Sequence, residues 1–191
     1  MRIVYLLIFV TIISCAHDRK SSEELIPALS VESTDTSLHF TNGYWFKSGL
    51  PFSGNIVHRY EDGKINERTG YYNGKEEGWS YAFFDNSLVS EKRYYHLGEK
   101  DSVHSGWWQN GKPRFVYHFK TGVYNGYFTE WYGSGAIYKE IYYVDGKEDR
   151  AKGWRENGKV YMNFIVKEGR RYGLENSNLC FTVRQDSLTK E

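Results

Sequence analysis

The chain is poor in cysteine and carries almost no excess charge. Among its 191 residues are two cysteines, and 25 basic side chains are nearly balanced by 24 acidic ones. A near-neutral chain has no long-range field to attract nucleic acid or an anionic membrane surface. Lipidation of Cys15, argued below, would leave Cys180 without an intramolecular partner, and Leu179-Cys180-Phe181 is typical of a small buried cysteine. We expect no nucleic-acid partner and no disulfide framework.

The sequence also lacks the residue patterns of common catalytic and metal sites. No glycine-rich phosphate loop precedes a helix, and Gly133-Ser134-Gly135 occupies a turn position of the repeat described below. The six histidines show no metal-ligand spacing, and no pair of carboxylates recurs as an acid–base couple would. His104 and His118 are interpreted as packing or surface residues. We therefore expect a protein that is not an enzyme and that uses no cofactor and no metal.

The apolar run at the start of the chain is too short to cross a bilayer. It extends from Ile3 to Ile13 behind Arg2, whereas a membrane-spanning helix needs about 20 apolar residues. A charged start and a short apolar core are typical of a secretory signal. Ile12-Ile13-Ser14-Cys15 also resembles a bacterial lipobox, in which Cys15 becomes the lipidated first residue. We expect a signal peptide over residues 1–14 and a flexible tether over residues 15–38; the alternative is an ordinary secretory signal.

Turns marked by glycine recur along the rest of the chain at nearly constant spacing. The first series falls at Gly63, Ser87, Gly111, Gly135 and Gly158, and the second at Gly74, Gly98, Gly122, Gly146 and Gly169. The steps within each series are 24, 24, 24 and 23 residues, and the two series stay 11 residues apart. A fixed period of this size is typical of a repeat architecture, in which each unit buries its apolar side by stacking on its neighbours.

The segments between the turns predict strands, because they are dense in Tyr, Phe, Trp, Ile and Val. Many of the turns are Asn-Gly or Asp-Gly, which supply the positive backbone dihedrals of tight hairpins. We therefore predict an all-β fold, with five antiparallel hairpins in one curled meander sheet over residues 39–173. A leading strand near Tyr44–Lys47, a trailing strand near Phe181–Val183, and a capping segment and tail over residues 174–191 would flank it.

The hairpin register predicts two different faces of the sheet. If Asp62-Gly63 is a two-residue loop, residues 60 and 65 lie on one face and residues 59 and 66 on the other. The first, here named the core face, gathers apolar columns such as Tyr71, Tyr95 and Phe119. The second, the stripe face, is mostly polar but carries the aromatic stripe Phe83, Trp107, Trp131 and Trp154, with Arg114 and Tyr138 between its rings. The stripe either stabilises an exposed face or forms a binding site.

Two segments carry a resemblance to known repeats, from Gly126 to Gly135 and from Ile141 to Lys147. They resemble MORN-type repeats, most closely the variant in bacterial proteins of the YwqK family of toxin–antitoxin antitoxins. The resemblance covers residues 43–173 and implies a module for protein or membrane association, and the antitoxin label implies neutralisation of a toxin. Gly106-Trp107-Trp108-Gln109-Asn110-Gly111-Lys112 is also similar to the Gly-Trp repeats of choline- and glucan-binding cell-wall modules.

These observations lead to one functional expectation and two alternatives. We expect a non-catalytic protein-interaction or scaffolding module in the bacterial cell envelope, held to a membrane by a lipid on Cys15. Its unknown protein partner would bind the stripe residues Phe83, Trp107, Trp131 and Trp154 together with Arg114 and Tyr138. The alternatives are an antitoxin or immunity-type protein and a module that binds a glycan of the cell wall.

The lipid anchor makes a direct prediction. Metabolic labelling with a palmitate analogue should mark the wild-type protein and place it in the membrane fraction, because the lipobox cysteine is the attachment site. Cys15→Ala should lose both the label and the membrane association, whereas Cys180→Ala should keep both. An unlabelled wild-type protein in the soluble fraction would refute the anchor.

Overall fold

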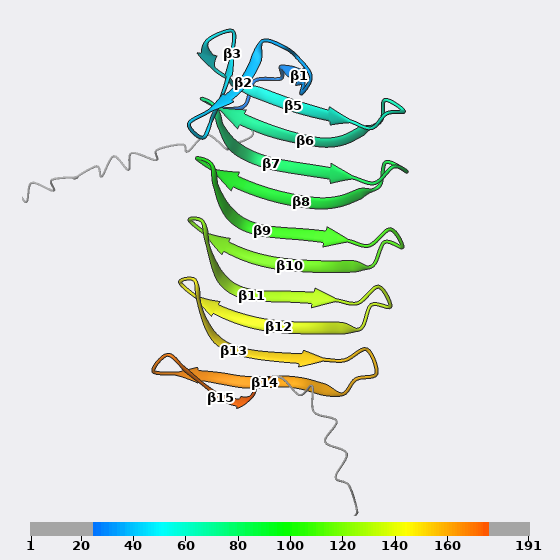
Figure 1. The fold of residues 1–191 in the computed structure, drawn as a ribbon, viewed down its shortest axis with the longest axis vertical. Coiled ribbons are helices and arrows are strands. Elements are labelled where there is room, and N and C mark those ends of the chain that lie inside the picture. Colours follow the sequence, from blue (N-terminus) through cyan, green and yellow to red (C-terminus); the bar gives the residue numbers. More distant parts are fainter. Residues whose placement is uncertain (1–24, 176–191) are drawn as a thin grey trace, which may run out of the picture.

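The computed structural model describes residues 25–175 and contains two β-sheets. A 12-stranded sheet runs in the order β1-β5-β6 and then consecutively to β15, and a three-stranded sheet has the order β2-β3-β4 (Figure 1). The strands are β1 (Ser30–Glu32), β2 (Leu38–Thr41), β3 (Tyr44–Lys47), β4 (Leu50–Pro51), β5 (Gly54–Arg59), β6 (Ile65–Tyr72), β7 (Lys75–Phe83), β8 (Val89–His96), β9 (Glu99–Trp107), β10 (Pro113–Lys120), β11 (Val123–Trp131), β12 (Ile137–Val144), β13 (Lys147–Trp154), β14 (Val160–Lys167) and β15 (Arg170–Leu174).

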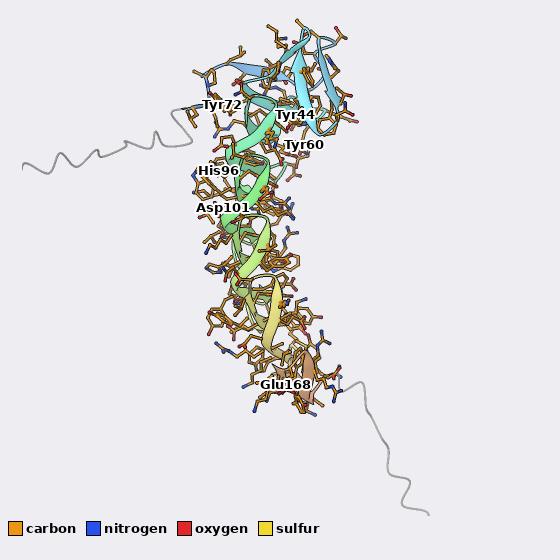
Figure 2. All side chains as sticks on the ribbon, turned by 90° about the vertical axis from the view of Figure 1, so that its left-hand side faces the viewer. Tyr44, Tyr60, Tyr72, His96, Asp101 and Glu168 are labelled. Atoms are coloured by element: carbon orange, nitrogen blue, oxygen red, sulfur yellow. The ribbon has the colours of Figure 1, made fainter. Side chains whose placement is uncertain are left out.

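The predicted all-β repeat of antiparallel hairpins is confirmed. From β5 to β15 every strand pairs antiparallel with the next one in the chain, so the large sheet is an open meander of stacked hairpins. Seen from its edge in Figure 2, the sheet is one layer thick along most of its length, with side chains standing off both faces. Stability must therefore come from contacts between neighbouring strands rather than from a second packed layer.

The two turn series differ in geometry. In the second series both loop residues have positive φ, as at Asn73 (49°) and Gly74 (82°), which is the two-residue type I′ hairpin that Asn-Gly favours. In the first series the N–H of Gly63 donates to the carbonyl of Tyr60 (3.0 Å), and the N–H of Tyr60 donates to the carbonyl of Lys64 (2.9 Å). This loop contains three residues, 61–63, so the predicted two-residue loop at Asp62-Gly63 is wrong.

The Asn or Asp of a first-series turn explains the longer loop. Its side chain accepts a hydrogen bond from the N–H two residues later, as Asp62 Oδ1 does from Lys64 (3.0 Å) and Asn110 Oδ1 from Lys112 (3.0 Å). These residues keep a negative φ, and only the following glycine is left-handed, as in the type I turn with a glycine bulge. Residue 59 consequently faces residue 65 instead of residue 66.

Backbone hydrogen bonds connect four of the five second-series turns to the segment one repeat earlier. The N–H of Gly98 donates to the carbonyl of Glu76 (2.9 Å), that of Gly122 to Lys100 (2.8 Å), and that of Gly146 to Tyr124 (2.8 Å). Each bond spans 22 residues, as does the bond from Gly74 to Phe52 (2.7 Å). The turns thus couple each repeat to the one before it.

The N-terminal end of the sheet is covered by the segment that we predicted to be tether. Strand β1 pairs in parallel with β5, and Val31 is buried with Phe52, Ile56 and Tyr71. The boundary of the flexible tether at residue 38 is therefore wrong: burial of Val31 orders this part of the chain. The predicted leading strand Tyr44–Lys47 exists as β3 but belongs to the small sheet. Residues 1–24, with the signal peptide and Cys15, and residues 176–191, with the trailing strand, lie outside the described residues.

The core face is buried in two places. At the N-terminal end the small sheet packs Leu38 and Trp45 against the cluster around Ile56. Further along, Phe128, Ile141, Ala151 and Phe164 form one row across β11 to β14, and their burial agrees with the predicted core face. Between them the same face carries buried polar groups, including Thr69, Ser80 and His104.

The turn at Ser87 provides a test of the repeat geometry. Ser87 replaces the first-series glycine and has a φ of 65°, a conformation that costs an L-residue free energy but costs glycine none. Ser87→Gly should raise the free energy of unfolding by about 0.5–1 kcal/mol, measured by urea denaturation. Ser134→Gly, in the same turn series but outside the left-handed position, is the matched control and should bring no gain. Equal effects of the two changes would contradict this account.

His104 predicts how stability depends on pH. Its ring is 2% exposed and lies between Tyr95 and Phe119, with centroids at 5.4 and 4.6 Å. Burial lowers the pKa of His104 below its ordinary 6.5, and the hydrogen bond with the Tyr94 carbonyl (2.7 Å) opposes this only in part. Neutral His104 therefore contributes fully to the free energy of unfolding above pH 6.5. This contribution is lost as the pH falls from 6.5 towards the lower pKa that His104 has in the folded protein.

Unfolding curves recorded from pH 7.5 to 5 test this expectation. The wild type should lose stability over this interval, and His104→Phe should flatten the loss, since Phe128 occupies the equivalent position one repeat later. His58→Gln, at an exposed histidine, should leave the loss unchanged. If His104→Phe loses stability as steeply as the wild type, another group is responsible.

Candidate functional site

The structure divides the six residues that we expected to form one site: Trp131, Arg114 and Tyr138 line one hollow, whereas Phe83, Trp107 and Trp154 do not line it. Phe83, Trp107, Trp131 and Trp154 end β7, β9, β11 and β13 on the stripe face, and all four are half-buried. Phe83 stacks on Tyr81 (6.4 Å between centroids), and the ammonium of Lys152 lies 5.2 Å from the Trp154 ring. Within residues 25–175, no ring contact joins one stripe residue to the next.

Arg114 and Tyr138 lie on the core face, so their predicted place within the stripe is wrong. The cause is a β-bulge beside every first-series turn. At each bulge, two residues of one strand lie opposite a single residue of the neighbouring strand. Arg114 and Phe115 both face Gly106, and Tyr138 and Lys139 both face Glu130. Consecutive side chains therefore point to the same face, and the strict alternation that we used in the prediction fails at this position.

Glycines opposite the bulges make room for the extra side chain. A Cβ on Gly106 would lie 2.3 Å from the Phe115 ring, and one on Gly153 would lie 2.7 Å from the Tyr161 ring. Neither glycine belongs to a turn series, and neither has a positive φ. A strand glycine without a turn role is the signal in the sequence that indicates these bulges.

The bulges help to form a hollow on the core face, here named the repeat hollow, with a volume of about 620 Å³. Residues from β8, β10 and β12 and from the end of β11 surround it. Its aromatic wall consists of Trp108, Tyr132 and Tyr138, and its floor contains Phe115 and Tyr117, whose rings stack at 4.4 Å. The volume is within the usual range of ligand pockets.

Hydrogen bonds to the backbone of the next repeat hold the aromatic wall in place. Trp108 donates through Nε1 to the carbonyl of Trp131 (3.2 Å), and Tyr132 donates through its hydroxyl to the carbonyl of Trp154 (3.0 Å). Tyr138 lies edge-on to Tyr132 at 5.1 Å. Because their polar atoms are already paired, these rings are pre-organised to offer apolar surface to a ligand.

Two ionic groups complete the lining. Glu91 pairs with both Arg93 and Arg114, and the Arg114 guanidinium lies 5.1 Å from the Phe115 ring. Glu130 accepts a hydrogen bond from the Tyr117 hydroxyl (2.7 Å) and pairs with Lys139 (3.3 Å). Burial and this hydrogen bond raise the pKa of Tyr117, which keeps the phenol protonated as the donor.

The charged side chains that line the repeat hollow balance: Arg93 and Arg114 are positive, and Glu91 and Glu130 are negative. The Nε of Arg114, however, is the one buried side-chain nitrogen or oxygen among the described residues without a hydrogen-bond partner. The hollow therefore combines fixed aromatic surface with one unpaired donor on a cationic side chain, a lining suited to an apolar ligand that carries an acidic group.

The remaining chemistry of the described chain is limited. Within residues 25–175, no group of three or more His, Cys, Asp or Glu side chains could hold a metal ion. In the same range no helix is long and apolar enough to cross a membrane. His118, interpreted from the sequence as a packing or surface residue, is half-buried and bonded through Nδ1 to the Tyr127 carbonyl (2.7 Å). Neither a protein-family model nor a curated protein matches this sequence.

Proposed function

We propose that the protein is a non-catalytic binding module that takes a protein partner into the repeat hollow. The pre-organised lining of the hollow carries the proposal: Trp108, Tyr132 and Tyr138 held around Arg114, on a sheet that needs no rearrangement to present them. Tryptophan, tyrosine and arginine are the residues that contribute most to binding energy in protein interfaces. The unpaired Nε of Arg114 favours a partner segment with an acidic side chain beside an apolar one.

The path of the N-terminal segment is compatible with an anchored protein. Ile26, Pro27 and Ala28 lie beside Asn55 and Trp79 on the stripe face, at the N-terminal end of the sheet. The repeat hollow opens on the opposite face and further along the repeats. A lipid on Cys15, proposed from the lipobox, would thus hold the protein in the bacterial envelope and leave the hollow free for a partner.

The stripe face favours a second candidate, a module that binds a glycan of the cell wall. Trp107, Trp131 and Trp154 recur on alternate strands, about 9.5 Å apart if each strand adds about 4.8 Å. Regularly spaced rings offer apolar surface to successive sugars of a linear chain. An antitoxin or immunity-type role is the third candidate, and it would use the repeat hollow to hold a toxin.

Photo-crosslinking from matched positions tests the proposal. Benzoylphenylalanine replaces Tyr138, in the repeat hollow, or Tyr142, four residues along the same strand and on the opposite face. We expect a discrete crosslinked protein from position 138 and none from position 142. Arg114→Glu, combined with the label at position 138, should abolish the crosslink because it reverses the charge that selects the partner.

Other outcomes separate the candidates. A crosslink from position 142 alone would move the site to the stripe face and refute the repeat hollow. If the protein binds purified cell wall, loses this binding in Trp107→Ser/Trp154→Ser and gives no crosslink from position 138, the glycan-binding alternative would be established. Circular dichroism and the urea midpoint of every variant show whether the fold is retained.

A further inference from the structure

A second hollow lies at the N-terminal end of the large sheet and is independent of the proposed function. This cap hollow, of about 510 Å³, lies between the small sheet and the turns at Gly74 and Gly98. In Figure 2 the small sheet stands to one side of the large one, near the labelled Tyr44. One wall is aromatic, formed by Phe40, Tyr44, Trp45 and Tyr71, and the other carries the carboxylates of Glu76 and Glu99.

The aromatic wall is fixed to the large sheet. The N–H of Trp45 donates to the carbonyl of Gly74 (2.8 Å), and the N–H of Phe52 donates to the carbonyl of Trp45 (2.9 Å). The Trp45 ring lies 6.3 Å from Tyr71 and 5.4 Å from Phe40. Gly74 also lies so close to the small sheet that a Cβ there would be 2.8 Å from the Trp45 carbonyl. The cap hollow is therefore formed before any ligand enters.

Glu76 is a half-buried carboxylate that makes no direct ion pair. Among the described residues it forms neither an ion pair nor a side-chain hydrogen bond, although it lies in the wall of the hollow. Burial raises the pKa of Glu76, and the negative charge of Glu67 raises it further. The two cations that oppose this shift, Arg93 and Lys100, are engaged elsewhere: Arg93 pairs with Glu91, and Lys100 lies 5.4 Å from the Phe119 ring.

The equivalent residue of a later repeat shows what Glu76 lacks. Glu148 occupies the same position, two residues after its turn glycine, and pairs with Arg171 at 2.6 Å. At the cap hollow the position equivalent to Arg171 is Lys100, which lowers the pKa of Glu76 through its charge but forms no ion pair with it. A half-buried carboxylate without a direct partner carries a desolvation cost, and a cation that enters the hollow would reduce this cost.

The aromatic wall already binds a cation within the molecule. The ammonium of Lys75 lies 5.2 Å from the centre of the Tyr44 ring, within the range of a cation–π contact. With Lys75 included, the lining carries one positive and two negative charges, so the hollow is negative overall. Phe40 is 60% exposed and Leu97 is 58% exposed, which leaves apolar surface for the carbon atoms attached to a charged group.

We propose that the cap hollow is a binding site for an organic cation, an ammonium group whose attached carbons contact Phe40 and Trp45 and whose charge neutralises Glu76. Aromatic rings around a carboxylate are the arrangement that selects alkylated ammonium groups over metal ions and neutral molecules. The group belongs either to a small molecule or to a lysine side chain of a polypeptide, and the experiment distinguishes these sources.

Titration of the full chain followed by amide NMR tests the site. Tetramethylammonium should produce saturable shifts at the amides of Trp45, Gly74 and Gly98, whereas tert-butanol, of similar shape but neutral, should not. Glu76→Gln should weaken binding about tenfold through loss of the charge. Glu148→Gln, the matched change at the paired glutamate, should leave it unchanged. Phe40→Ala, at an exposed ring, is a second variant that should weaken binding without disturbing the fold.

Several results would overturn the proposal. One is the absence of saturable shifts, and another is equal binding of tert-butanol, which would show only an apolar hollow. Equal affinity of wild type and Glu76→Gln, with unchanged amide signals elsewhere in the sheet, would also refute it. A short lysine-containing peptide that binds more tightly than tetramethylammonium would identify a polypeptide as the source of the cation, and the reverse order would identify a small ammonium compound.

Discussion

One backbone hydrogen bond, repeated along the molecule, holds the architecture together. The N–H of a second-series turn glycine donates to a carbonyl 22 residues earlier, at Gly74, Gly98, Gly122 and Gly146. An open single-layer sheet has no second layer to hold its hairpins in place, so each repeat must be coupled to its neighbour directly. With a positive φ, these glycines point their N–H groups towards the earlier strand. Because each turn must meet a carbonyl of the preceding repeat, the turns recur at a constant period.

Side chains extend the same coupling across the sheet. Tyr60, Trp108 and Tyr132 occupy equivalent positions and each donates to a backbone carbonyl of the following repeat. These bonds serve the fold and also hold two of the rings that form the aromatic wall of the repeat hollow. The same residues therefore stabilise the array and shape its surface. This dual role explains how a protein without a thick core can present a fixed surface at which we propose that a partner binds.

The bulges decide which face carries the residues of the proposed binding site. Without them, Arg114 and Tyr138 would stand among the rings of the stripe; with them, both residues line the repeat hollow on the core face. The cap hollow has a different origin, since its aromatic wall comes from the small sheet, outside the repeats. The two hollows also differ in charge: the charged side chains of the repeat hollow balance, whereas those of the cap hollow are negative overall.

Local chemistry alone determined the repeat. Asn-Gly and Asp-Gly turns and aromatic segments at a fixed period predicted the hairpins, their order and the face of Phe83, Trp107, Trp131 and Trp154, because turn geometry and strand propensity act over a few residues. The tertiary structure decided the three-residue loops, the bulges, the burial of Val31 and the position of the small sheet. These features depend on contacts between segments far apart in the chain. A bulge shifts which residues face each other, and only the paired strands reveal that Gly106 leaves room for Phe115 and that Arg114 turns to the core face.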